Sequence, residues 1–141
     1  MFKKLHKNEK GFTLAELLIV VSIIGVLVAI SIPIFTSQLE KAREATDLAN
    51  IRSAYAEISA AALSEDDKPA DTSYITFNRT GSENAYVYTA TVKLTQKEAG
   101  WKTASGKTAV AGITASGDPK VNGTAVVTVN EATGVTTIEY K

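Results

Sequence analysis

A single carboxylate lies within the most apolar stretch of the chain. Glu16 is the only charged residue between Phe12 and Phe35. A charge in an apolar medium costs about 2.5–3.5 kcal/mol on membrane-insertion scales, so such groups usually have a partner. No basic side chain lies between Phe12 and Lys41. If the chain were cut after Gly11, the new amino group of Phe12 would be a cation close to Glu16, and this spacing predicts charge pairing within one chain or between neighbours.

Snorkelling is the alternative for Glu16, because the residue lies only five residues inside the apolar run. A carboxylate near a helix end can reach water from the headgroup level of a membrane. A cut after Gly11 would favour pairing instead.

The chain has few of the side chains and motifs that enzyme active sites use. His6 is the only histidine, and there is no cysteine, so histidine- or thiol-based nucleophilic catalysis lacks its side chains once the first residues are removed. Residues 105–108 end like a phosphate-binding loop, but that loop needs a glycine where Trp101 stands. We therefore expect no enzyme, no cofactor and no metal site.

The apolar run predicts a membrane-spanning helix that stays in the mature protein. A helix from Phe12 to Phe35 reaches about 36 Å, and a bilayer core is about 30 Å thick. A secretory signal has its small-residue cleavage site after the apolar segment. Here the only well-placed small residue at a polarity boundary is Gly11, which precedes the run. Cutting there would remove residues 1–11 as a leader.

The leader is basic, and this predicts its orientation. By the positive-inside rule, lysines next to a membrane span stay on the cytoplasmic side, so the remainder of the chain should lie outside a single-pass span. The lysines are Lys3, Lys4, Lys7 and Lys10, offset only by Glu9.

The stretch from Gly11 to Val21, GFTLAELLIVV, resembles the signature of the type IV pilin and pseudopilin superfamily. The resemblance implies that a prepilin peptidase cuts after Gly11 and methylates the amino group of Phe12. It also implies that Glu16 attracts the amino terminus of the adjoining subunit as a filament grows. Gly25 and Pro33 fall where the family often places helix-weakening residues, so the segment between them should loosen on assembly; a static kink is the alternative.

The resemblance further implies the function, the partners and the location. The chain would be a subunit of a type IV pilus that serves adhesion, motility or DNA uptake. Its partners would be other copies of itself, the peptidase, an assembly platform with minor pilins, and membrane lipid before assembly. It would be stored in the cytoplasmic membrane and then displayed in an extracellular filament. A pseudopilin of a type II secretion or competence system is one alternative, and an uncleaved signal-anchored binding protein is another.

An amphipathic segment over residues 36–63 should continue the helix. Apolar residues recur there at spacings of three and four, and charged residues occupy the other faces. An element from residue 12 to residue 63 would be about 78 Å long, and a cover is needed for its apolar stripe. We assign to the stripe Leu39, Ala42, Ala45, Leu48, Ile51, Tyr55, Ile58 and Ala62, and to the other faces Glu40, Lys41, Arg43, Glu44, Asp47, Arg52 and Glu57.

The pattern of residues 64–141 predicts a small antiparallel sheet of three to four strands, which would cover the apolar stripe of the helix. We therefore expect an α+β protein, with the pilin fold that the resemblance implies. Alternating apolar residues indicate strands within 86–94, 125–129 and 135–140, with a further short strand over 74–78. Asn130 to Gly134 has the length and the glycine of a hairpin loop. Within residues 97–120 we expect turns, one short strand near 108–114, and Trp101 in a core or a subunit contact.

Composition limits what the domain is and what it binds. The chain has 141 residues, of which 45% are hydrophobic, so one small domain fits beside the apolar helix. Without cysteine, a secreted domain must be held by its core or by its neighbours. Losing the leader removes four lysines and one glutamate and leaves 11 basic and 14 acidic side chains. We therefore expect no nucleic-acid site, which usually needs a basic patch.

Overall fold

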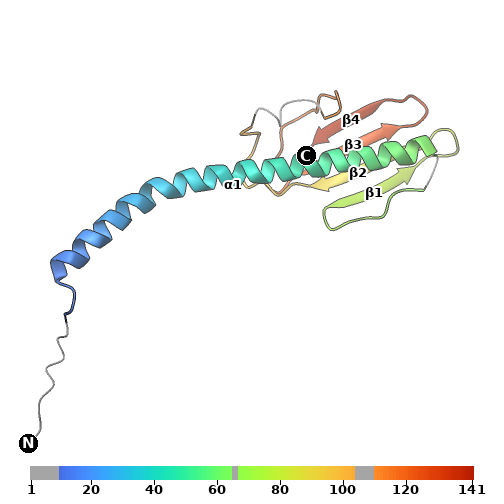
Figure 1. Cartoon of the computed structure of the whole chain (residues 1–141). Helices are drawn as coiled ribbons and strands as arrows, with labels where there is room; N and C mark the ends of the chain where they lie inside the picture. The colour runs from blue at the N-terminus through green and yellow to red at the C-terminus, as the bar shows by residue number, and fades with distance from the viewer. Residues whose placement is uncertain (1–9, 65–66, 104–109) are drawn as a thin grey trace, which may run out of the picture. The chain divides into compact units, whose positions relative to one another are not determined.

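The computed structural model describes residues 10–64, 67–103 and 110–141 (Figure 1). One long helix is followed by four strands, which confirms the expected α+β class. The helix is α1 (Leu14–Ser64), and the strands are β1 (Ile75–Thr80), β2 (Val87–Lys93), β3 (Thr124–Asn130) and β4 (Thr136–Tyr140).

The chain divides into two compact units, residues 1–37 and residues 38–141, and α1 contributes to both. In the amino-terminal unit, α1 runs without interruption through Gly25 and Pro33. Thr36 donates its hydroxyl to the carbonyl of Pro33 at 3.0 Å. The loosening expected between Gly25 and Pro33 remains a prediction.

The four strands form an antiparallel meander in which each strand pairs with the next one along the chain. The register aligns Phe77 with Ala90, Ala90 with Val127, and Val127 with Ile138. All four are buried. Because side chains alternate across a strand, this row marks the face of the sheet that packs in the core.

The loop between β3 and β4 is the predicted hairpin. Gly134 donates its N–H to the carbonyl of Asn130 at 2.8 Å, and Asn130 donates to the carbonyl of Val135 at 3.0 Å. Gly134 has a φ of 66°, a conformation that a residue without Cβ adopts at little cost.

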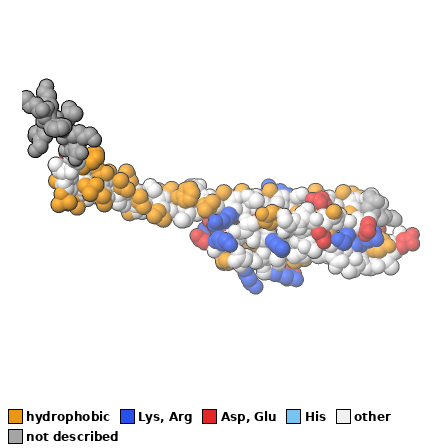
Figure 2. Space-filling model, turned by 90° about the horizontal axis from the view of Figure 1, so that it is seen from below, with side chains coloured by type: hydrophobic (Ala, Val, Ile, Leu, Met, Phe, Trp, Pro, Cys, Tyr) orange, Lys and Arg blue, Asp and Glu red, His pale blue; other side chains and the backbone are white. Residues whose placement is uncertain are grey.

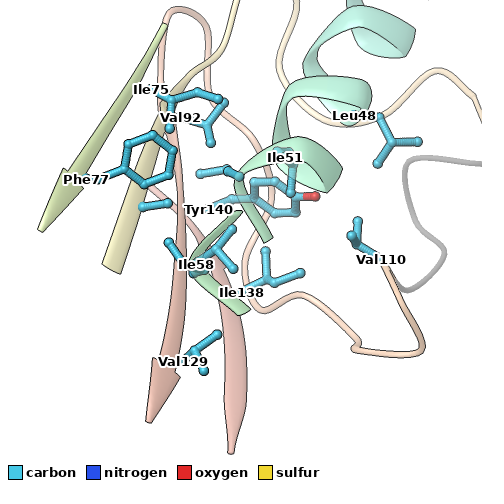
Figure 3. Packing of buried hydrophobic residues seen from close by; sticks show 14 of the residues in the cluster. Leu48, Ile51, Ile58, Ile75, Phe77, Val92, Val110, Val129, Ile138 and Tyr140 are labelled. Atoms are coloured by element: carbon cyan, nitrogen blue, oxygen red, sulfur yellow. The ribbon is translucent and has the colours of Figure 1, made fainter. Parts of the chain in front are cut away.

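The core of the carboxy-terminal unit lies between α1 and the sheet. Figure 3 shows Ile51 and Ile58 of α1 among side chains of the strands, such as Ile138 and Tyr140. Trp101 belongs to the same cluster and packs edge-on against Tyr140, with ring centroids 5.5 Å apart, which confirms a core position for the indole.

The predicted apolar stripe is wrong over its first three positions. Leu39, Ala42 and Ala45 are exposed, although all three were expected to face the cover. Glu40, Glu44 and Asp47, which were assigned to the other faces, are buried instead. The stripe that faces the sheet becomes apolar only from Leu48, and it continues through Ile51, Ala54, Ile58 and Ala61.

The strand expected near residues 108–114 is also not found in the described part of that stretch. Residues 110–113 form a tight turn, closed by a hydrogen bond from the N–H of Ile113 to the carbonyl of Val110 at 2.9 Å. Ala111 and Gly112 in this turn have positive φ angles, which end an extended strand. Residues 105–108, which resemble the end of a phosphate-binding loop, lie outside the described residues.

Candidate functional site

The junction before α1 is exposed and non-helical. Residues 10–13 precede the helix, and Phe12 is 91% exposed. Among the described residues, no heavy atom lies within 4 Å of the position that a Cβ on Gly11 would take, apart from its neighbours in the chain. The basic residues Lys3, Lys4 and Lys7 lie outside the described residues.

Thr13 and Glu16 form a capping box that starts α1. Thr13 donates its N–H to Glu16 Oε2 at 2.9 Å, and Glu16 donates its N–H to Thr13 Oγ1 at 3.2 Å. The carbonyl of Thr13 accepts the N–H of Leu17, so Thr13 is the N-cap residue. The carboxylate of Glu16 therefore has a local partner in the uncut chain. The sequence carries this signal as a threonine followed by a glutamate three residues later, but the search for a cationic partner overlooked it.

The helix that follows presents apolar side chains on all sides. Every leucine, isoleucine, valine and phenylalanine from Phe12 to Phe35 is at least 45% exposed. On the face seen in Figure 2, hydrophobic side chains recur along this part of the chain, and no acidic or basic side chains are visible among them. α1 contains a segment long and apolar enough to cross a membrane.

The few polar side chains of this segment bond to the helix itself. Ser22 and Ser31 donate their hydroxyls to the carbonyls of Leu18 and Leu27, each at 2.7 Å. With Thr36 and the capping box, all five polar side chains from Thr13 to Thr36 have a local partner. Segments inside lipid must satisfy their polar groups internally, and each of these side chains makes at least one hydrogen bond within the segment.

Three buried carboxylates in the carboxy-terminal unit were missed by the sequence analysis. Glu40, Glu44 and Asp47 lie on α1 at spacings of four and three, and each is at most 3% exposed. They accept hydrogen bonds from residues 95–103, the segment that follows β2, and we call these three residues the carboxylate ladder. The signal was their spacing, because these positions continue the stripe of Ile51, Ala54, Ile58 and Ala61 toward the start of the unit.

Asp47 and Glu40 bind the first half of that segment. The carboxylate of Asp47 accepts the N–H and hydroxyl of Thr95 and the N–H of Gln96, at 2.8–3.1 Å. Glu40 Oε1 accepts the N–H of Lys97 at 2.5 Å and that of Glu98 at 2.8 Å.

Glu44 binds the second half of the segment. It accepts the N–H groups of Lys102 and Thr103 at 2.6 and 2.9 Å, and the hydroxyl of Thr103 at 2.8 Å. Hydrogen bonds to a charged acceptor are about twice as strong as neutral ones. The ladder thus supplies hydrogen-bond acceptors for backbone N–H groups of this segment that have no partner in a neighbouring strand.

Glu40 also pairs with Arg43, whose guanidinium lies 3.0 Å from Glu40 Oε2. Burial raises the pKa of Glu40, but the N–H groups of Glu98 and Lys97 and the guanidinium of Arg43 together outweigh burial and hold the pKa below its ordinary value. The described residues contain no group of three or more histidine, cysteine, aspartate or glutamate side chains placed to hold a metal ion.

Comparisons with known proteins agree with the amino-terminal features. Residues 6–32 match the family model of the prokaryotic N-terminal methylation motif. The chain is 52% identical over 52 residues to the type IV narrow pilus major component PilA5 of Thermus thermophilus, a match that covers 35% of this chain and 45% of the relative. It is 50% identical over 36 residues to the fimbrial protein EcpB of Eikenella corrodens, covering 26% of this chain and 23% of the relative. No solved structure matches the chain.

Both matches span less than half of the relatives' length, so they bear on part of the chain. The methylation motif contains Gly11, Phe12 and Glu16. The structure adds the long apolar helix and the antiparallel sheet. The amino-terminal part of the chain is therefore similar to that of type IV pilins: it carries a prokaryotic N-terminal methylation motif that leads into a long helix, and a four-stranded antiparallel sheet follows.

Proposed function

We propose that the chain is the structural subunit of a type IV pilus, cut after Gly11 and polymerised through residues 12–35, most of which lie in the first part of α1. The observation that carries the proposal is the apolar helical surface from Phe12 to Phe35, which nothing in the described chain covers. A surface of this size needs lipid or protein around it.

Packing between copies would supply most of the stability of the filament. Burying one large apolar side chain is worth about 1.5–3 kcal/mol, and fourteen aliphatic side chains and two phenylalanines are exposed from Phe12 to Phe35. The membrane would hold the same surface before assembly. Residues 12–35 would then form the filament core, residues 36–63 would continue the helix, and residues 64–141 would form the outer domain.

The geometry of the junction suits processing. A peptidase needs an accessible, unfolded stretch, and residues 10–13 are exposed and precede the first turn of α1. Cleavage would place the amino group of Phe12 one residue before the capping box, and methylation would follow there. Thr13 engages Glu16 Oε2, so Oε1 is left to accept the amino group of an adjoining copy.

The partners follow from this route. A prepilin peptidase would cut on the cytoplasmic face of the membrane, and an assembly platform with minor pilins would extract the subunit into a surface filament. The relatives are named as a pilus major component and a fimbrial protein. These names favour a pilus over a secretion or competence pseudopilus. Adhesion, motility and DNA uptake are the roles that such a filament could serve.

Mass spectrometry of the amino-terminal peptide tests the proposal. Filaments sheared from cells should contain a chain that begins with methylated Phe12, whereas the membrane fraction should also contain uncut precursor. A chain that keeps Met1 and is found only in membranes would refute both processing and assembly and would leave a membrane anchor.

A further inference from the structure

We propose that residues 95–103 form a strap that the carboxylate ladder holds against α1 at neutral pH and releases when its carboxylates are protonated. The proposal concerns the carboxy-terminal unit alone and goes beyond filament assembly. It rests on how the strap is attached.

The strap depends on the ladder for its main-chain hydrogen bonds. Glu40, Glu44 and Asp47 accept six of its backbone N–H groups, those of residues 95–98, 102 and 103. A protonated carboxyl is a weaker acceptor than a carboxylate, and one of its oxygens becomes a donor that faces other donors. Protonation therefore leaves buried N–H groups without adequate partners, which favours opening to water.

Among the described residues, three further hydrogen bonds outside the ladder join the strap to the segment that precedes β3. Gly100 donates its N–H to the carbonyl of Pro119 at 2.8 Å, the backbone carbonyl of Gln96 accepts the N–H of Asn122 at 3.4 Å, and Lys97 Nζ donates to Asn122 Oδ1 at 2.8 Å. Two buried atoms of the strap, Gln96 Oε1 and Trp101 Nε1, have no hydrogen-bond partner among the described residues. Opening would let both atoms bind water, so these groups do not oppose release.

The ladder also attracts two basic side chains. Arg43 lies 3.0 Å from Glu40 Oε2, and Lys102, which lies 2.6 Å from Glu98, is attracted by Glu44 and Glu40 as well. Once the ladder is neutral, both bases lose the attraction of its carboxylates, which weakens the hold of α1 on the strap. Lys41 on α1 and Asp118 and Lys120 beside Pro119 are the remaining charged neighbours in sequence, and Tyr140 faces the indole.

Trp101 makes release observable. It is the only tryptophan in the chain, it lies on the strap, and it is buried against Tyr140. An open strap would expose the indole and move its emission to longer wavelength, while the paired strands of the sheet remain in place.

The experiment uses the full-length chain in detergent micelles. Hydrogen exchange, corrected for the intrinsic effect of pH, is measured for the strap amides and for the paired amides of β2 and β3 at pH 7 and in acid. We expect the strap amides to lose protection by about tenfold or more in acid, before the sheet amides do. Emission from Trp101 should shift over the same pH range.

The variant Glu44→Gln tests whether loss of a ladder charge is enough to release the strap without acid, because the substitution removes the charge and keeps the shape of the side chain. We expect this variant to show the loss of strap protection already at pH 7. The matched control is Glu57→Gln on the same helix. Within the described part of the chain, the carboxylate of Glu57 accepts only the hydroxyl of Ser53, at 2.9 Å. Glu57→Gln should behave like the unmodified chain.

Two outcomes would overturn the proposal. In one, the strap amides and the sheet amides lose protection together, so that release is global unfolding. In the other, Glu44→Gln and Glu57→Gln give the same protection at pH 7. Neither outcome bears on whether the chain is processed or forms filaments. If Glu44→Gln fails to fold, the proposal is still tested by the unmodified chain, in which the strap amides must lose protection in acid before the sheet amides do.

Discussion

Asp47 and Thr95 are joined by three hydrogen bonds, although 48 residues separate them in the sequence. Both carboxylate oxygens of Asp47 accept the N–H of Thr95 at 2.9 Å, and Oδ1 also accepts its hydroxyl at 2.8 Å. Asp47 is fully buried, and Thr95 follows shortly after β2 ends at Lys93. This contact ties α1 to one end of the sheet in a domain that has no disulfide.

Asp47→Ala should lower the free energy of unfolding by about 3 kcal/mol, since buried donors that lose a charged acceptor each cost about 1–3 kcal/mol. Urea unfolding followed by circular dichroism measures the change. Glu57→Ala, an acid on the same helix without such contacts, should stay within about 0.5 kcal/mol. Equal effects of the two substitutions would mean that the contact contributes nothing specific.

Stability should decrease in acid, in part through Glu40. Its pKa is held below the ordinary value in the folded chain, so the unfolded chain binds a proton more readily. The contribution of Glu40 is therefore complete above the ordinary pKa of about 4.5 and is lost as the pH falls through the lower folded value. Urea midpoints measured from pH 7 down to pH 3 should show this loss, and Glu40→Gln should make the dependence shallower. An unchanged slope in the variant would exclude Glu40 as a source.

Core packing predicts a different pattern, without pH dependence. Ile51 is fully buried between α1 and the sheet, so Ile51→Ala should cost about 3 kcal/mol through lost burial and a cavity. Leu63→Ala on the same helix removes a side chain that is 88% exposed and should cost little in the monomer. Thermal melts at pH 7 measure both changes. If the two variants melt together, the core does not lie where the structure shows it.

Much of this architecture could be predicted because it follows local patterns. The helix, all four strands and the hairpin at Gly134 follow from apolar periodicity and turn chemistry, which act over a few residues. The carboxylate ladder could not be predicted in this way. A buried Glu44 is acceptable only because Lys102 and Thr103 donate their N–H groups to it, and those residues lie 58 and 59 positions further along the chain. Without that contact, a charged residue is correctly expected to face water.

The capping box at the candidate processing site differs from the ladder in this respect. The pair Thr13 and Glu16 could be predicted from the sequence, because the motif is local. Its presence means that Glu16 caps the helix through hydrogen bonds, a task that is separable from the charge pairing with an amino group proposed above. The structure shows the first task, and the second is part of the proposal.

Three substitutions separate the two tasks of Glu16. Glu16→Gln keeps an acceptor for the N–H of Thr13, since glutamine also serves in a capping box, but it removes the charge. Thr13→Ala keeps the charge and weakens the cap by about 1 kcal/mol. Glu16→Ala removes both. Two readouts are measured in cells: the amount of the chain recovered by shearing, and processing judged by the mass of the amino-terminal peptide.

We expect all three variants to be cut after Gly11, because the junction remains exposed and non-helical. Glu16→Gln and Glu16→Ala should both yield far fewer filaments, whereas Thr13→Ala should assemble nearly as well as the unmodified chain. This pattern would assign assembly to the charge. Normal filament yield from Glu16→Gln together with poor yield from Thr13→Ala would assign it to the cap instead, and the pairing proposed for Glu16 and Phe12 would be wrong.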